Sequence, residues 1–342
     1  MFKLFIFSVC FFLTSFANFS KEGVKLAKLE CELKPEERKE QLEARKIKEP
    51  SMVTEEEIAS KKREIENLAI ESGISKKNAE MARTLLFMPA ISTSEVRQPE
   101  KILSFEEYFS RTIPASKILD AKNFLIDNFE DLEIIENEYK VDKEIIVTLI
   151  LIETYFGRVL GKHNIMDSLF SLILTSHRPQ FWQTELLNVF TLIERGDTLY
   201  NRDTKGSWAG AVGMVQFIPS SFIKLAKDGD GDGKIDTVNN KLDAFASAAN
   251  YLKISGWKYN APFLKEINLN LTQSELCVQA GMPFQDGVLV IPDKKLDTKT
   301  FVVYNNFAVV LLWNKSLFFG TTAGIIYNEL KNVSSKNIAK SK

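Results

Sequence analysis

Residues 142–158 read DKEIIVTLILIETYFGR, and this stretch decides the fold of the chain. Its body is almost entirely apolar from Ile145 to Ile152. Apolar residues recur at helical spacing over a longer span, which predicts a helix over 141–160. Asp142 can cap the start of this helix and Glu144 can complement its dipole. An apolar helix of this kind needs a sizeable core around it.

Glu153 is the residue that ends the apolar run. A carboxyl group next to such a run is expected to be partly desolvated, and desolvation raises the pKa of a carboxyl group. A raised pKa lets the group stay protonated and act as an acid near neutral pH. Tyr155, Phe156 and Gly157 follow at once and supply aromatic surface and a close-approach backbone position. Composition alone also fits a second interpretation, in which Glu153 marks the point where the helix re-enters solvent.

The segment Gly206-Ser-Trp-Ala-Gly-Ala-Val-Gly-Met-Val-Gln-Phe-Ile-Pro-Ser-Ser221 is the second informative stretch. Its glycines and alanines let the backbone approach another backbone or a ligand closely. Ser207 and Gln216 are polar groups inside this small-residue stretch, and the hydroxyl and acetamido groups of a sugar would suit them. A tight helix-packing seam with Ser207 as a cap explains the pattern equally well.

The other segments predict a mostly helical chain with a small β element. The chain has 342 residues, which allows one large domain or two lobes. Residues with helical patterning are 54–86 with a break at Gly73, 115–129, 169–176, 184–195, 242–255 and 306–330. Residues 287–292 and 300–304 favour strands. The predicted fold class is therefore α+β, mostly α.

Composition excludes several classes of protein. Apolar residues make up 45% of the chain and charged residues 26%, which excludes a disordered or fibrous chain. The net charge of −1 is not that of a nucleic-acid binder. The 3 cysteines cannot form a dense disulfide scaffold, and the 2 histidines leave little room for a His-rich metal site.

The N-terminus predicts export. Residues 1–17 combine Lys3, a short apolar run and a small-residue site ending at Ala17, as in a cleaved signal peptide. An uncleaved anchor is the main alternative, although the run is shorter than a spanning helix needs. A lipoprotein with Cys10 as the lipid acceptor is the weakest of the three interpretations. Cys31 and Cys277 would remain after cleavage, and we expect free thiols.

Three further parts complete the predicted organisation. Residues 18–50 are dense in Lys and Glu and predict a charged, solvated spacer. Residues 51–335 form the predicted catalytic domain. Residues 336–342 form a polar tail.

The motifs around Glu153 occur in a recognisable order. The chain resembles the membrane-bound lytic murein transglycosylase B family over residues 54–330. The residues that carry this resemblance are Ile152-Glu-Thr-Tyr-Phe-Gly-Arg158 with Gly161, then 206–221, Ala249-Asn-Tyr-Leu252 with Gly256-Trp257, and the flanking Arg97-Gln-Pro-Glu100, Tyr304-Asn-Asn-Phe307 and Trp313-Asn-Lys-Ser316.

The resemblance implies a lysozyme-like fold and a periplasmic enzyme. It implies non-hydrolytic cleavage of the β-1,4 bond between N-acetylmuramic acid and N-acetylglucosamine in peptidoglycan, which gives a 1,6-anhydro product. Glu153 matches the single acid that then becomes the base. Positions that line the sugar cleft match Ser207, Gln216, Tyr251 and Asn314. The implied partner is the glycan strand, bound by a monomer. Other cell-wall enzymes stay open as further partners.

Two aromatic positions depart from that family. Its members usually have Tyr-Asn-x-Ser with a tyrosine three residues on, whereas this chain has Trp313 and Phe319. A phenolic hydroxyl thought to orient substrate is missing if Phe319 is the counterpart. A catalytically weak peptidoglycan-binding or assembly protein and a lysozyme-type hydrolase therefore stay open as alternatives.

Residues 228–239, DGDGDGKIDTVN, resemble an EF-hand loop. The predicted ligands are Asp228, Asp230, Asp232, the carbonyl of Lys234, Asp236 and Asn239. Asn239 stands where a bidentate glutamate is usual, which predicts weak binding unless Asn240 or Asp243 substitutes. Ca²⁺ fits better than Mg²⁺ because the ligands are many and flexible. A metal-free Asp/Gly turn is the alternative. The transglycosylase family resembled here also has an Asp-Gly-rich loop, which supports a structural ion outside the chemistry.

Four polar residues have ordinary interpretations. Asp167 and Asp203 are weak candidates for a second carboxylate. His163 and His177 are expected to be surface or core histidines rather than catalysts.

Overall fold

A computed structural model describes residues 48–94, 103–268, 283–284, 287–292 and 299–340. The described residues are mostly helical with two small sheets, as predicted. The helices are η1 (Pro50–Met52), α3 (Glu55–Glu71), α4 (Lys76–Ala79), η2 (Glu80–Thr84), α5 (Pro89–Ser94), α6 (Phe105–Thr112), α7 (Ala115–Asp127), α8 (Phe129–Tyr139), α9 (Lys143–Thr154), α10 (Ile165–Thr175), α11 (Pro179–Glu194), α12 (Pro219–Leu225), α13 (Lys241–Ile254), α15 (Asn305–Trp313) and α16 (Leu317–Lys340).

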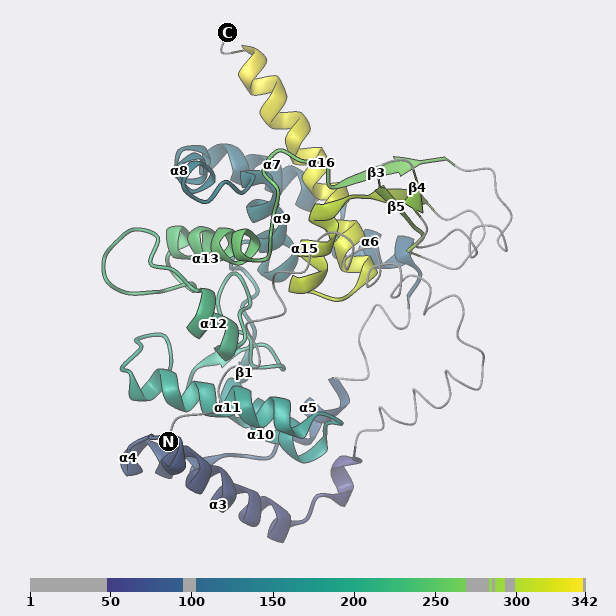
Figure 1. Ribbon diagram of the computed structural model, residues 1–342. Helices are drawn as coiled ribbons and strands as arrows, with labels where there is room; N and C mark the ends of the chain where they lie inside the picture. The colour runs from purple at the N-terminus through teal and green to yellow at the C-terminus, as the bar shows by residue number, and fades with distance from the viewer. Residues whose placement is uncertain (1–47, 95–102, 269–282, 285–286, 293–298, 341–342) are drawn as a thin grey trace.

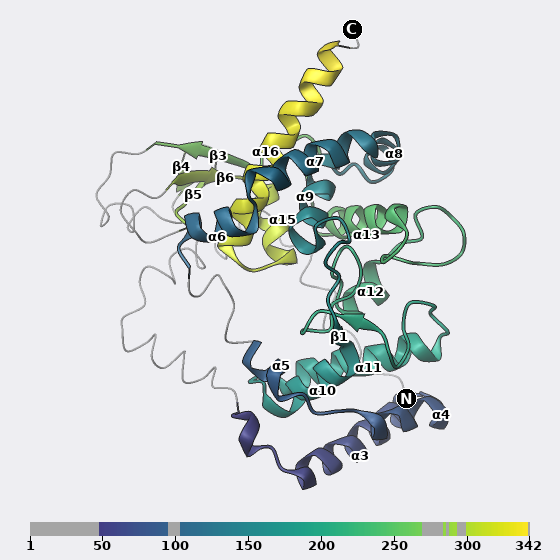
Figure 2. The same ribbon diagram turned by 180° about the vertical axis from the view of Figure 1, so that it is seen from behind.

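The helices form two groups (Figures 1 and 2). In one group α9 packs against α7, α8, α13 and α16. In the other, α11 packs against α10 and α3, and α10 packs against α5. Helix α12 and a two-stranded ribbon lie between the groups. The fold therefore sets the C-terminal end of α9 toward the junction of the two groups.

The sheets are short and antiparallel. Strands β3 (Leu264–Ile267), β6 (Thr300–Val303), β5 (Gly287–Val290) and β4 (Pro283–Phe284) form one sheet in that order. The sequence predicted β5 and β6 but not β3, in which two exposed charged residues interrupt the apolar pattern. Strands β1 (His163–Asn164) and β2 (Lys205–Gly206) form the other sheet. This ribbon brings the segment after Glu153 to the glycine-rich segment.

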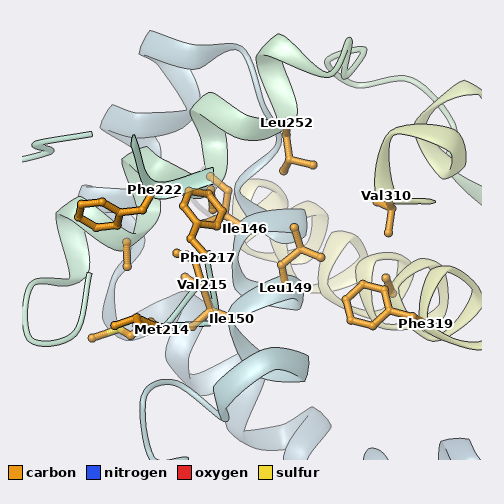
Figure 3. Packing of buried hydrophobic residues seen from close by; sticks show 14 of the residues in the cluster. Ile146, Leu149, Ile150, Met214, Val215, Phe217, Phe222, Leu252, Val310 and Phe319 are labelled. Carbon is orange, nitrogen blue, oxygen red and sulfur yellow. The ribbon is translucent and has the colours of Figure 1, made fainter. Parts of the chain in front are cut away.

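Helix α9 lies in the centre of its group because its apolar residues surround it. Every residue from Lys143 to Leu151 is buried. Figure 3 shows Ile146, Leu149 and Ile150 of this helix between the glycine-rich segment and the C-terminal helices. The helix ends at Thr154 rather than near 160, because Tyr155, Phe156 and Gly157 all have positive φ. This left-handed turn fixes the direction in which the chain leaves Glu153.

Asp142 stands before the first residue of α9, but its carboxylate does not cap the helix. It accepts hydrogen bonds from the Trp257 indole N–H (2.7 Å) and the Tyr327 hydroxyl (3.2 Å) instead. The Lys331 ammonium lies 2.6 Å from Asp142 and 3.3 Å from Glu144. The predicted cap is therefore a tertiary anchor, which holds α9 to α13 and α16.

Other helix ends follow recognisable local signals. The Thr54 hydroxyl caps α3 by accepting from the Glu57 N–H, and Gly73 turns the chain with φ of +88°. The helix predicted over 306–330 is two helices that break at Asn314. Helix α16 continues to Lys340, into the segment predicted as a tail.

Several predictions lie outside the described residues. These are the signal peptide, nearly all of the charged spacer, the Arg97–Glu100 motif and both Cys31 and Cys277. Within the described part of the chain, no helix is long and apolar enough to cross a membrane.

Candidate active site

Glu153 lies in the last turn of α9 and is partly buried. Burial raises the pKa of its carboxyl group to about 7, and the hydrogen bond from Trp313 opposes this rise. A carboxyl group with this pKa is available in both protonation states near neutral pH, which is what a group that gives and then takes a proton requires. The desolvation expected from the apolar run is therefore present.

Trp313 is the side chain that sequence reasoning did not assign to the site. Its indole Nε1 donates a 2.9 Å hydrogen bond to Oε1 of Glu153. The Trp313 ring also packs on Tyr251, with centroids 4.7 Å apart, and on Phe217, with centroids 5.4 Å apart. The sequence marked Trp313 as part of a flanking motif and as a departure from a family pattern, without a role in the site. Its contact with a residue 160 positions away carries no local signal.

Thr154 joins the end of α9 to the glycine-rich segment. Its hydroxyl donates to the Met214 carbonyl (2.9 Å) and accepts from the Gly157 N–H (3.1 Å). Gly161 makes the next close approach: a Cβ there would lie 2.2 Å from the Gly206 carbonyl oxygen. The small residues of the two motifs therefore allow the two backbones to meet, as their composition indicated.

Ser207 and Gln216 organise the glycine-rich segment itself. The Ser207 hydroxyl accepts from the N–H groups of Ala211 (3.1 Å) and Ala209 (3.3 Å). The Gln216 amide donates to the Gly213 carbonyl at 2.9 Å, and the residue has φ of +49°. Both side chains are only partly buried. They therefore keep surface for a ligand while they hold the turn.

Tyr251 packs against Trp313, and Asn314 follows Trp313 in the chain. The Tyr251 hydroxyl donates to the Leu312 carbonyl (2.8 Å), and burial raises the pKa of Tyr251 to about 12. The Asn314 side chain accepts from the Ser316 N–H (3.0 Å) at the break between α15 and α16. Phe319, in contrast, is 3% exposed and belongs to the core. The structure therefore brings Trp313 to Glu153 and Tyr251 to Trp313, whereas Phe319 offers no surface to a ligand.

A second polar cluster lies beside the turn that follows Glu153. The Tyr155 hydroxyl donates to Asp120, and Arg158 lies over the Tyr155 ring. The Phe124 and Phe156 rings stack with centroids 4.1 Å apart. Asp120, Phe124, Phe156 and Arg158 border a pocket of about 360 Å³. Sequence reasoning did not find Asp120, because α7 carries it far from the motifs.

The acidic loop gathers three of its predicted ligands. Carboxylate oxygens of Asp228, Asp230 and Asp232 lie within 4.8 Å of one another. The N–H groups of Gly233 and Gly231 hold the pKa of Asp228 below its ordinary value. The three carboxylates are therefore placed to hold one cation among them.

Two other predicted ligands contact each other. The Asn239 amide donates to Asp236 (2.8 Å), and Asp236 lies outside the group of three carboxylates. Asp243 is 1% exposed and accepts from the N–H groups of Gly229 (2.7 Å) and Asp236 (2.6 Å). Asp243 therefore fastens the two ends of the loop.

The two candidates for a second carboxylate are an ion-paired aspartate and an exposed one. Asp167 is buried, pairs with Arg202 at 2.6 Å and accepts from the Leu86 N–H. Asp203 is exposed in a turn. Both therefore fit the ordinary interpretation better than a catalytic one.

Comparison with known proteins places this site in a family. The transglycosylase SLT domain family matches residues 57–326. The membrane-bound lytic murein transglycosylase B of Escherichia coli (strain K12) is 42% identical over 119 residues, which are 35% of this chain. The match spans about a third of the length of that curated relative.

Solved structures share the fold over most of the chain. SltB3 from Pseudomonas aeruginosa, in complex with NAG-NAM-pentapeptide, has a TM-score of 0.71 and 25% identity over 80% of this chain and 79% of that one. The Slt35 lytic transglycosylase from Escherichia coli, in complex with calcium, has a TM-score of 0.67 and 24% identity over 80% of this chain and 92% of that one. The predicted resemblance to lytic transglycosylases is confirmed, and the chain belongs to the transglycosylase SLT domain family.

Proposed function

We propose that the protein is a lytic transglycosylase of peptidoglycan. The observation that carries the proposal is Glu153, a carboxyl group at the end of a buried helix with its pKa raised to about 7 by burial. The proposed reaction cleaves the β-1,4 bond between N-acetylmuramic acid and N-acetylglucosamine without water. The complexes of SltB3 with NAG-NAM- and NAG-anhNAM-pentapeptides support this class of substrate.

The proposed reaction has two proton transfers at Glu153. In the first, the protonated carboxyl gives its proton to the glycosidic oxygen as the bond from that oxygen to C1 of the muramoyl residue breaks. In the second, the resulting carboxylate takes the proton of the muramoyl 6-hydroxyl as its oxygen bonds to C1. The products are the free hydroxyl of N-acetylglucosamine and a 1,6-anhydro ring. The enzyme returns to its starting protonation state.

One carboxyl group suffices in this scheme. Most glycoside hydrolases use a second carboxylate as a nucleophile or to activate water. Asp167 is held by Arg202 and Asp203 is exposed in a turn, so neither is placed for that role. The substrate supplies its own nucleophile in the 6-hydroxyl group.

We assign sugar binding to the side chains around Glu153. The partly buried Ser207 and Gln216 offer hydroxyl and amide groups on one side. On the other side, Tyr251 offers its ring and phenolic oxygen and Asn314 offers its amide. Glycan strands would be the ligand of a monomer exported to the bacterial periplasm, where other cell-wall enzymes are further candidate partners.

The acidic loop is proposed as a structural cation site. Asp228, Asp230 and Asp232 would hold Ca²⁺, and carboxylate oxygens are the ligands that this ion prefers. Asn239 contributes no charge and is turned to Asp236, so the affinity would be weak. The ion would neutralise the loop and takes no part in the chemistry.

Product analysis tests the proposal. Purified sacculi are digested and the released fragments are weighed by mass spectrometry. Fragments with 1,6-anhydro ends support a lytic transglycosylase. Fragments heavier by one water molecule per cut would show a hydrolase on the same fold. Binding of sacculi without release of any fragment would favour the binding protein.

A further inference from the structure

The two oxygens of the Glu153 carboxyl group are not equivalent. Oε1 accepts the indole N–H of Trp313, and this is the hydrogen bond that the Glu153 side chain makes within the described residues. An indole N–H is a donor only, so it cannot accept a proton from Oε1. The bond therefore favours an unprotonated Oε1 and leaves any proton on Oε2.

We propose that Trp313 is a positioning residue that holds Oε1 of Glu153 as an acceptor and thereby reserves Oε2 for both proton transfers. The proposal rests on the proposed function and assigns its chemistry to one atom. Oε2 gives its proton to the glycosidic oxygen as the bond to C1 breaks. Oε2 then takes the proton of the 6-hydroxyl as the new bond to C1 forms. Trp313 keeps its own proton throughout and stabilises the carboxylate between the two steps.

Packing keeps the indole in place for this role. The Tyr251 ring meets Trp313 edge-on at 62° with centroids 4.7 Å apart, and the Phe217 ring is tilted at 52°. The Tyr251 hydroxyl is fixed in turn on the Leu312 carbonyl, next to Trp313 in the chain. Two rings from separate segments therefore limit rotation of the indole. Its N–H is directed before a substrate arrives, as preorganised electrostatic stabilisation requires.

The polar side chains in the turn after α9 are engaged with a partner other than Glu153. The titratable side chains on the neighbouring segments include Tyr251 on α13, which packs on Trp313, and Tyr155 and Arg158 in the turn after α9. Tyr155 donates to Asp120, and Arg158 lies 4.0 Å from the same carboxylate. Burial and the Trp313 bond are the two influences on the pKa of Glu153, and burial is the larger.

NMR of the indole nitrogens tests the contact directly. The chain has 4 tryptophans, so ¹⁵N-indole labelling gives a short spectrum, and Trp313→Phe assigns one signal by its loss. We expect the Trp313 signal to shift with pH with a midpoint near neutrality. We expect Glu153→Gln to remove that shift. A Trp313 signal that does not change with pH, or that still titrates in Glu153→Gln, would overturn the proposal.

The pH profile of sacculus digestion tests the consequence. Trp313→Phe removes the N–H and keeps a ring, so protonated Glu153 should persist to higher pH. The alkaline limb of kcat/KM should move up by about 1 to 2 pH units, because a hydrogen bond to a charged group has roughly that effect. The matched control is Trp257→Phe, which removes an indole N–H from Asp142 at the opposite end of α9.

Trp257→Phe should lower the melting temperature and leave the alkaline limb of kcat/KM at its wild-type pH. An unchanged limb in Trp313→Phe would contradict the proposal, and so would an equal movement in both variants. If wild-type protein releases no fragments or releases hydrolysed ones, the proposed function fails. The NMR titration still decides whether Trp313 and Glu153 act as a pair.

Discussion

The two ends of helix α9 carry carboxyl groups in opposite circumstances. At the start, Asp142 is fully buried and accepts from Trp257, Tyr327 and the Asn260 N–H while it pairs with Lys331. At the end, Glu153 is partly buried and, among the described residues, accepts one hydrogen bond, from Trp313. The same apolar helix therefore separates a carboxylate with many partners from one with few.

This difference teaches what makes a carboxyl group an acid. Three donors and the Lys331 ammonium engage the oxygens of Asp142, so that group anchors the helix. Burial with one donor leaves the charged form of Glu153 costly, and its pKa rises to about 7. Both ends depend on an indole N–H. The number of additional partners decides between an anchor and a proton donor.

The largest expected effect is on activity, and it follows from replacing the acidic side chain of Glu153 at the end of α9. Glu153→Gln should lower sacculus-digesting activity by about 10²- to 10⁴-fold, because an acid–base group contributes on that order. The matched control is Glu185→Gln, a buried glutamate that accepts from the Ser220 N–H away from the site. Equal activity in Glu153→Gln and wild type would mean that Glu153 is not the acid.

A substitution at the opposite end of α9 should change the stability of the protein rather than its activity. Asp142→Asn removes a buried partner of Lys331 and should destabilise the protein by about 2 to 4 kcal/mol. Denaturant unfolding at neutral pH measures this change. A loss under about 0.5 kcal/mol, the size of an ordinary surface substitution, would remove the contrast between the two ends.

The pH dependence of stability provides a third test. The pKa of Glu153 is about 7 in the folded protein against an ordinary 4.5, so the folded state binds this proton more tightly than the unfolded state. The resulting stability is complete below pH 4.5 and is lost as pH rises through about 7. Relative to Glu153→Gln, wild type should therefore lose about 3 kcal/mol between these limits.

Denaturant unfolding of both proteins at pH 4.5 and pH 8 measures this loss. A difference that stays constant with pH would show that the pKa of Glu153 is ordinary.

A smaller effect is expected from the Thr154 hydroxyl, which joins the end of α9 to the glycine-rich segment. Thr154→Val removes the bonds to the Met214 carbonyl and the Gly157 N–H, which should cost about 1 to 3 kcal/mol of stability. Activity should fall as well, since the turn after Glu153 loses its attachment. Thr148→Val is the matched control, because Thr148 is buried in the same helix and its hydroxyl donates to the Glu144 carbonyl within that helix. Equal activity losses in the two variants would contradict a specific role for the hydrogen bonds of Thr154.

The smallest effect is expected from the acidic loop, which lies outside the comparison of the two ends. Asp230→Ala combined with Asp232→Ala should lower the melting temperature in Ca²⁺ by an amount equivalent to about 1 kcal/mol, as for weak binding to the folded state. The same change should have no effect in chelator. An equal shift in both conditions would count against a metal.

Some elements of the fold could be predicted from the sequence, whereas others depend on tertiary packing. Apolar spacing predicted α7, α9, α10, α11 and α13 within a few residues, because burial on a helix face leaves a periodic mark. The end of α9 was placed too late, since the left-handed turn at Tyr155 and Phe156 leaves no mark in hydropathy. Strand β3 was missed for a similar reason, because its pairing with β6 overrides a weak pattern.

The same distinction holds for the residues of the candidate active site. The sequence by itself determined that Glu153 ends a buried apolar run and that small residues in 206–213 allow two backbones to meet. Only the tertiary structure decided that Trp313 donates to Glu153, that Asp142 anchors instead of capping, and that Phe319 is buried. Local periodicity records burial, which is a property of one segment. A hydrogen bond between segments far apart in the chain is a property of the packed fold.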